Sequence, residues 1–311
     1  MVFQIEDIHK SFGKKQVLKG IDFSAQSGQA FGLLGRNGAG KTTTIRIIMN
    51  VFPADSGSVL LDGAPFSKSG LQIGYLPEEH GLYPKIKVRE QLIYLAELRG
   101  VSGKKAKQSI DYWVARLGMQ EYANRKLDTL SKGNQQKIQL VAALMADPAM
   151  VILDEPFSGL DPVNAALLKD VVKELIEKGK IVLFSSHQMS YVEEFCDAIA
   201  ILHEGKIALS GSIQQIKRSY DRRTLVVRSL QPGPLLDFAN GTLGGYLQSA
   251  EMRKNQVFLH MKEENCKAQV IEILAKEGPE IDSVAVYEPS LNDIFVQTAG
   301  DDNETKGGEA V

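Results

Sequence analysis

Residues 35–43 read GRNGAGKTT and match the phosphate-binding pattern G-x-x-x-x-G-K-[ST]. A short apolar run, AFGLLG, precedes this motif and a helical pattern, TTTIRIIMN, follows it, which is the strand-to-helix context that the motif requires. A glycine-rich turn alone would not explain why Lys41 and Thr42 stand in register. Glycines let successive backbone N–H groups face one point at the positive end of a helix. The motif therefore predicts a binding site for a nucleoside triphosphate.

The chemistry of the individual side chains suggests how this phosphate loop would act. Lys41 can reach the β and γ phosphates, and the hydroxyl of Thr42 can bind Mg2+. We expect the nucleotide to contact the following loop residues: Gly35, Asn37, Gly38, Ala39, Gly40, Lys41, Thr42 and Thr43.

Two further apolar runs end in polar groups that suit phosphate chemistry. Residues 149–155, AMVILDE, end in Asp154 and Glu155, and residues 180–187, KIVLFSSH, end in His187. Both runs are typical of parallel strands buried on two faces, and the sequence between them predicts the crossover helix. The carboxyl ends of such strands share one edge, where ligands bind. Asp154 is suited to holding Mg2+, and a carboxylate at Glu155 could orient and deprotonate a water; an isolated acidic pair could instead only cap the loop.

Composition limits the class of protein. The chain has 311 residues, about two domains by length, and its 36 basic and 38 acidic residues give a net charge of -2. This balance favours neither nucleic acid nor an anionic membrane surface, so we expect no nucleic-acid partner. Cys196 and Cys266 lack paired spacing, which argues against a disulfide framework or a zinc site. No apolar run is long enough to span a bilayer and the first ten residues lack a secretion signal, so we expect a cytoplasmic chain.

The order of patterns predicts an α/β protein with added parts. Residues 2–28 and 56–63 resemble antiparallel strands, residues 85–148 are mostly helical, and residues 197–211 form a hairpin. Residues 220–299 read as strand, helix, strand, strand, helix, strand, which suggests a small α+β, ferredoxin-like accessory domain. Residues 300–311 are polar, which predicts a disordered tail.

Taken with GRNGAGKTT, four segments identify the family that the chain resembles. They are LSKGNQQK at 130–137, VILDEP at 151–156, SGLD at 158–161 and SSH ending at residue 187. In order and spacing they resemble the ATP-binding subunits of ABC transporters over residues 1–215. The resemblance implies a P-loop ABC-type ATPase domain with an antiparallel β subdomain and a helical subdomain, and it makes ATP and Mg2+ the expected cofactors.

The resemblance also implies roles for single residues. Glu155 would be the general base, His187 would contact the γ-phosphate and the catalytic water, and Phe12 would stack on adenine. Ser131 and Gly133, at the positive end of a helix, would bind an ATP held by the opposite subunit. Asp161 would lie at the boundary between the two subunits.

Three residues depart from the family's pattern. Lys132 and Asn134 replace a glycine and a glutamine of the usual LSGGQ, and Glu78 stands where the family has a glutamine that touches Mg2+. A carboxylate can still bind this hard cation, although it brings negative charge toward the triphosphate. We therefore expect a metal site of Thr42, Glu78 and Asp154. The effect of the three departures on turnover stays open.

Together these features predict the ATP-hydrolysing subunit of an exporter of the drug or sodium efflux kind. Two subunits, identical or different, would enclose two ATP molecules head to tail and drive a separately encoded membrane permease, which would hold the chain at the inner face of the membrane. The permease would choose the substrate, and the C-terminal domain would stabilise the dimer, regulate it or simply pack. The alternatives are an ABC-type ATPase that acts on ribosomes or DNA, and a phosphate-loop kinase or GTPase, which leaves LSKGNQQK, SGLD and His187 unexplained.

Overall fold

In a computed structural model, which describes residues 1–79 and 81–300, the chain forms two compact units. Of the described residues, the first unit comprises Met1–Ile213 together with residues 295–300, and the second comprises Gln214–Ile294. The last helix, α10 (Leu291–Gly300), therefore begins in the second unit and ends in the first, whereas the sequence analysis counted residues up to 299 with the C-terminal domain.

A six-stranded sheet in the order β10-β9-β3-β8-β7-β6 organises the first unit. Its strands, in chain order, are β3 (Gln29–Leu34), β6 (Ile73–Leu76), β7 (Met150–Asp154), β8 (Ile181–Ser186), β9 (Ala198–His203) and β10 (Lys206–Ser212). Every residue of β7 and β8 is buried, and the two strands pair in parallel. The α/β architecture and the two central parallel strands that the sequence predicts are thus confirmed.

The four strands that bear the motifs run in the same direction. β3 pairs in parallel with β8, β8 with β7, and β7 with β6. Their carboxyl ends consequently lie at one edge of the sheet. Only β10 is antiparallel, because the two-residue turn at Glu204 and Gly205 joins it to β9 as a hairpin.

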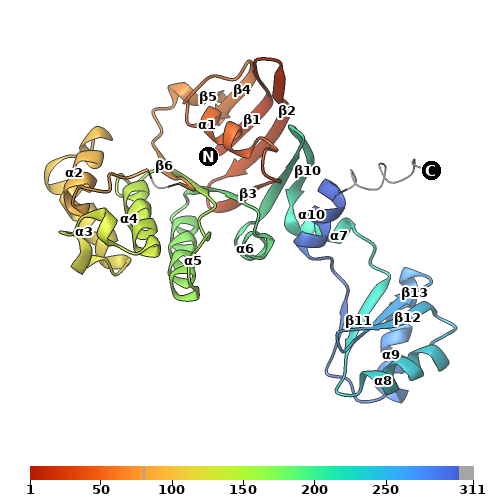
Figure 1. The fold of residues 1–311 in the computed structure, drawn as a ribbon. Helices are drawn as coiled ribbons and strands as arrows, with labels where there is room; N and C mark the ends of the chain where they lie inside the picture. The colour runs from red at the N-terminus through yellow and green to blue at the C-terminus, as the bar shows by residue number, and fades with distance from the viewer. Residues whose placement is uncertain (80, 301–311) are drawn as a thin grey trace, which may run out of the picture. The chain divides into compact units, whose positions relative to one another are not determined.

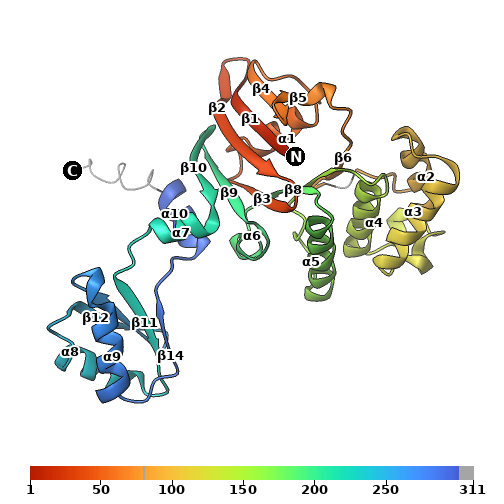
Figure 2. The ribbon, with the colours of Figure 1, turned by 180° about the vertical axis from the view of Figure 1, so that it is seen from behind.

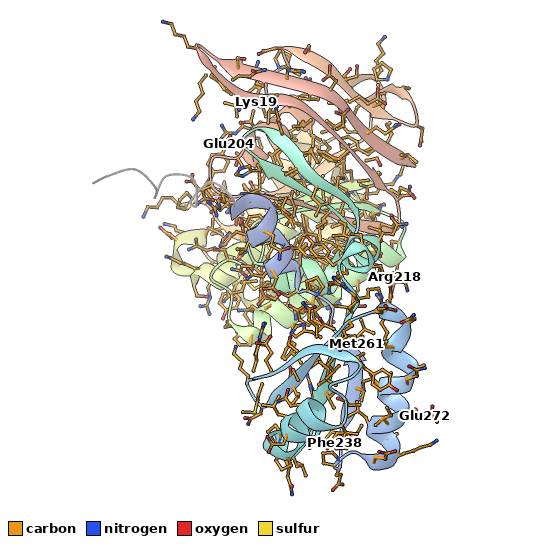
Figure 3. All side chains as sticks on the ribbon, turned by 90° about the vertical axis from the view of Figure 1, so that its right-hand side faces the viewer. Lys19, Glu204, Arg218, Phe238, Met261 and Glu272 are labelled. Atoms are coloured by element: carbon orange, nitrogen blue, oxygen red, sulfur yellow. The ribbon has the colours of Figure 1, made fainter. Side chains whose placement is uncertain are left out.

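A second, antiparallel sheet covers one face of the first. Its order is β2-β1-β4-β5, and its strands are β1 (Val2–Phe12), β2 (Lys15–Gln26), β4 (Ser56–Leu61) and β5 (Ala64–Pro65). Phe3, Ile5 and Ile21 of this sheet share one buried core with Leu33 and Ile152 of the main sheet. The two sheets also touch at an edge, where the Lys19 amide donates to the Gly205 carbonyl at 2.7 Å, close to the labels Lys19 and Glu204 in Figure 3.

Helices cover both faces of the main sheet. Figures 1 and 2 show α1 on the side of the antiparallel sheet, with α4, α5 and α6 on the opposite side. The α-helices that lie wholly within this unit are α1 (Lys41–Ile48), α2 (Val88–Leu98), α3 (Gly103–Arg116), α4 (Lys132–Leu144), α5 (Pro162–Glu177) and α6 (Met189–Phe195). The next helix, α7 (Ile213–Ser219), starts at the last residue of this stretch and otherwise belongs to the second unit. The helical segment expected between residues 85 and 148 corresponds to α2, α3 and α4.

The core of the second unit is a four-stranded antiparallel sheet with two helices packed against it. In chain order it contains β11 (Thr224–Arg228), α8 (Pro232–Gly241), β12 (Leu247–Arg253), β13 (Gln256–Met261), α9 (Lys267–Glu277) and β14 (Ser283–Val286). The sheet order is β12-β13-β11-β14, the arrangement of a ferredoxin-like split βαβ fold. α8 and α9, located by Phe238 and Glu272 in Figure 3, pack on one face of the sheet through Leu235, Val270 and Leu274.

Two further expectations from the sequence concern the C-terminal tail and membrane-spanning helices. Residues 301–311, for which the sequence predicts a disordered tail, lie outside them. Within residues 1–79 and 81–300, the helices are all too short or too polar to cross a membrane.

Candidate nucleotide-hydrolysis site

Residues at or after the carboxyl ends of β3, β6 and β7 line one cleft, and β8 lies between β3 and β7. Leu34 of β3 lies beside Ser186 of β8, and Asp154 of β7 lies beside Ser185. The cleft has a volume of about 260 Å³. It is lined by residues from the β1–β2 hairpin, the phosphate loop, the segment after β6 and the end of β7: Lys15, Val17, Arg36, Asn37, Gly38, Gly40, Lys41, Thr42, Thr43, Glu78, Asp154 and Glu155.

The phosphate loop has a shape that only glycine permits. Gly38 and Gly40 have φ angles of 82° and 118°, in the region that L residues avoid. A Cβ atom at Gly40 would stand 2.6 Å from the Leu18 Cδ2 atom, and one at Gly35 would stand 2.5 Å from the Leu202 carbonyl oxygen. No side chain caps the start of α1. The first amides of α1 are therefore left to an anion, as in a phosphate-binding loop.

Lys41 lies folded back over this loop. Its Nζ donates to the Gly35 carbonyl at 2.7 Å and, less closely, to the Arg36 carbonyl at 3.4 Å. Burial lowers the pKa of Lys41, while the negative charges of Glu155, Asp154 and Glu78 oppose that shift. The ammonium group thus lies between the loop and three carboxylates, where a bound phosphate would give it a new partner.

Asp154 is a buried carboxylate beside the phosphate loop. The Tyr75 hydroxyl donates to its Oδ2 atom at 3.4 Å, and burial raises the pKa of Asp154. Burial also raises the pKa of Tyr75 to about 12, so the phenol stays a hydrogen-bond donor. Sequence analysis missed Tyr75, although it immediately precedes the Leu-Pro-Glu of the segment that contains Glu78.

The donor set of the cleft fits Mg2+. Thr42 supplies a hydroxyl and Asp154 and Glu78 supply carboxylates, all from the lining of one cleft. Among the described residues no three His, Cys, Asp or Glu side chains form a metal cage. Mg2+ commonly needs none, since it is held by one or two carboxylates together with substrate phosphates and water.

Glu78 gives a testable prediction for metal dependence. Because its carboxylate lines the cleft near Asp154, we expect Glu78→Ala to raise the Mg2+ concentration for half-maximal ATP hydrolysis roughly tenfold or more. A magnesium titration of steady-state hydrolysis measures this shift. Glu79→Ala is the matched control, since Glu79 is exposed, is not in the lining of the cleft, and offers Gln139 a backbone carbonyl that alanine keeps. Equal magnesium curves for Glu78→Ala and the wild type would contradict a metal-proximal role.

Glu155 is held by the end of β8. Its side chain is 6% exposed, its Oε1 atom lies 2.7 Å from His187 Nδ1, and its Oε2 atom accepts from Ser186 Oγ at 3.1 Å. The backbone of Glu155 has φ 48°, and its amide donates to the Ser185 carbonyl at 2.8 Å. His187, 57% exposed, therefore contacts the carboxylate, whereas the sequence analysis assigned it to the phosphate and the water.

Ser131 and Gly133 stand at the start of α4 and outside the lining of the cleft. Ser131 is the N-cap of α4, and its hydroxyl accepts from the Asn134 amide at 3.4 Å. Ser131 and Lys132 are both exposed. The positive end of α4 is thus exposed and is not part of the lining of this chain's own cleft.

Asp161 caps the helix that follows it, and a side chain of α4 bonds to the loop after Glu155. Asp161 caps α5 by accepting from the amides of Val163 and Asn164, and these bonds hold its pKa below its usual value. Gln136 Nε2 of α4 donates to the carbonyl of Pro156, the residue after Glu155, at 2.6 Å. The start of α4 is therefore tied to the loop that bears Glu155, a link that motif reading did not find.

Phe12 lies at the end of β1 and does not line the cleft. Its ring is 50% exposed and meets Phe52 edge-on at 5.5 Å, with Lys10 Nζ 5.6 Å from the ring centre. Lys15 and Val17, which follow it on β2, do line the cleft. An adenine ring that extends from the phosphate loop toward β2 would therefore meet Lys15 and Val17 before Phe12.

Comparison with known proteins agrees with this geometry. A family model described as ABC transporter matches residues 18–158, and one described as ATP-binding protein DrrA1-3-like, C-terminal domain, matches residues 211–299. The uncharacterized ABC transporter ATP-binding protein YhaQ of Bacillus subtilis (strain 168) is 41% identical over 297 residues, which cover 95% of this chain and 98% of that protein.

Two other proteins are similar over about two thirds of the chain. The linearmycin resistance ATP-binding protein LnrL of Bacillus subtilis (strain 168) is 38% identical over 215 residues, 68% of this chain and 69% of LnrL. A solved structure, described as that of an ATP binding subunit of an ABC transporter, is 28% identical with a TM-score of 0.65 and covers 70% of this chain and 92% of that one.

Proposed function

Since this chain belongs to the ATP-binding proteins of ABC transporters, we propose that it is the ATP-hydrolysing subunit of an exporter whose membrane permease is a separate chain. The observation that carries this proposal is the meeting of Lys41, Asp154 and Glu155 in one cleft at the carboxyl edge of the sheet. The chemistry of that cleft suits phosphoryl transfer to water, which needs positioning and charge stabilisation more than covalent chemistry.

The residues of the cleft have separate roles in binding phosphate, holding Mg2+ and activating water. The amides of the phosphate loop and Lys41 bind the β and γ phosphates. Thr42, Asp154 and Glu78 would hold Mg2+, which would neutralise phosphate charge. Glu155 orients the attacking water and takes its proton. His187 Nδ1 lies 2.7 Å from Glu155 Oε1 and its side chain is 57% exposed, so we expect the ring to turn to the γ-phosphate when ATP binds.

Each ATP lies between two copies of the chain. The phosphate loop and the start of α4 both carry free helix-end amides suited to phosphate, yet Ser131 is exposed and lies outside the cleft of its own chain. A second copy placed head to tail would bring its Ser131 and Gly133 to this chain's ATP. One chain contains both halves of such a site, so two identical copies suffice, with Asp161 near their boundary.

Hydrolysis drives the permease through closure and reopening of this dimer. ATP binds the closed dimer better than the open one, so binding shifts the population toward closure and loss of phosphate reverses it. The name of LnrL assigns that relative to resistance against linearmycin, which supports export as the direction here. The permease selects the substrate and holds this chain at the inner face of the membrane.

Purification from membranes tests the proposed partner. We expect the tagged Glu155→Gln chain, isolated from detergent-solubilised membranes with ATP, to retain a polytopic membrane protein that mass spectrometry identifies. The matched control is Lys41→Met, which should bind ATP weakly and so does not enter the closed state. Copurification of ribosomal RNA or DNA in place of a membrane protein would contradict the proposal and favour an ABC-type ATPase of ribosomes or chromosomes.

A further inference from the structure

Ser186 is the last residue of β8 and lies directly beneath the Glu155 carboxylate. Ser186 is 2% exposed, and its Oγ lies within hydrogen-bond distance of Glu155 Oε2, at 3.1 Å. The same Oγ lies 3.1 Å from the backbone nitrogen of Gln188. Ser186 therefore joins the backbone after β8 to the catalytic carboxylate through a single hydroxyl group.

The polarity of these two bonds is fixed. A backbone N–H can only donate, so Ser186 Oγ must accept from Gln188. The one hydroxyl proton of Ser186 is then free for Glu155, and a carboxylate oxygen can accept it. The Ser186 hydroxyl therefore donates to Glu155. The strand that contains Ser186, β8, is buried along its whole length.

The two oxygens of Glu155 have partners that differ in burial. Oε2 bonds to buried Ser186, whereas Oε1 bonds to His187, whose side chain is 57% exposed and can turn away. We propose that Ser186 is a positioning residue that anchors Oε2 and leaves Oε1 as the oxygen that acts on the attacking water. The inference rests on the proposed role of Glu155 as general base.

In the step so assigned, the water oxygen bonds to the γ-phosphorus while the bond to the β–γ bridging oxygen breaks. The proton of that water passes to Oε1 of Glu155, and ADP leaves with the bridging oxygen. Ser186 gives up no proton and touches neither water nor phosphate. Its effect is on the orientation of the base, and so on kcat rather than on ATP binding.

Steady-state ATP hydrolysis by Ser186→Ala tests this assignment. We expect kcat to fall about tenfold or more, because Glu155 can rotate away from the water, while KM for ATP stays within about twofold of the wild type. Ser186→Thr keeps the hydroxyl on a side chain that suits a strand, so it should restore most of kcat.

Ser229 provides a matched control in the C-terminal unit. Its Oγ donates to the Glu280 carbonyl at 2.6 Å and accepts from the Gln231 amide at 3.1 Å, the same pattern as at Ser186. Ser229→Ala therefore removes an equivalent pair of bonds without touching Glu155. We expect kcat of Ser229→Ala to equal that of the wild type, with both alanine variants melting as folded proteins.

Glu155→Gln, assayed beside these variants, separates failure of the inference from failure of the proposed function. If Glu155→Gln loses hydrolysis while Ser186→Ala keeps wild-type kcat, the anchoring role of Ser186 is wrong. An equal loss of kcat in Ser186→Ala and Ser186→Thr would also overturn it, because the hydroxyl would then not be the cause. If Glu155→Gln itself hydrolyses ATP normally, the base has been misassigned and the proposed function fails first.

Discussion

Replacement of Glu155 by Gln is expected to abolish ATP hydrolysis while leaving ATP binding intact. The amide has the size of the carboxylate but cannot take a proton from water, and general base catalysis contributes roughly 10²–10⁴-fold to such reactions. The phosphate loop and Lys41 reach ATP independently of Glu155, so affinity for ATP should not fall. Phosphate release under saturating ATP measures the first effect, and calorimetric titration with ATP measures the second.

An exposed glutamate of the same unit serves as the control for this substitution. Glu177 is exposed at the end of α5, just before the amino end of β8 and so at the edge of the sheet opposite the cleft, and Glu177→Gln should hydrolyse ATP at the wild-type rate. Wild-type turnover in Glu155→Gln would exclude Glu155 as the base.

Replacement of Lys41 by Met is expected to remove most ATP binding, and with it hydrolysis. Hydrogen bonds to charged groups contribute about 1.5–3 kcal/mol, so loss of the ammonium should raise Kd for ATP roughly tenfold to a hundredfold. Methionine occupies similar space and needs no hydrogen-bond partner, and burial already disfavours the Lys41 charge. The variant should therefore fold as well as the wild type.

Titration with ATP and a melting curve together check the Lys41 prediction. Lys107→Met, at an exposed position of α3, is the matched control and should bind ATP normally. An unchanged Kd in Lys41→Met, with hydrolysis also unchanged, would mean that the folded-back contact with the Gly35 carbonyl is not exchanged for a phosphate contact.

The parts of the fold that sequence predicts best are those that local rules dictate. β7 and β8 are continuous apolar runs, which is typical of strands buried on both faces, and the structure has them adjacent and parallel. The start of α4 was also foreseeable, because serine before a helical pattern is a strong N-cap signal. The family resemblance then added the order of motifs, and the comparisons agree with it.

The parts that sequence did not predict depend on contacts between distant segments. β6 is a short edge strand that pairs only with β7, and nothing in its four residues demands that position. Ser186 precedes His187 in a run that reads as ordinary strand, and its bond to Glu155 exists only once β7 and β8 pair. Phe12 matches the family's aromatic position, yet its stacking on adenine stays a proposal, since its ring contacts Phe52.

Complementation between two inactive variants tests most directly whether two chains share each ATP. Lys41→Met damages the phosphate loop, and Ser131→Arg fills the exposed start of α4 with a bulky cation. Sharing predicts that each variant alone fails to hydrolyse ATP, although Ser131→Arg still binds it. An equal mixture should regain roughly a quarter of wild-type turnover, since half of the two-fold dimers are mixed and each holds one intact site. Wild-type turnover by Ser131→Arg alone, with no gain on mixing, would contradict a site shared between two chains.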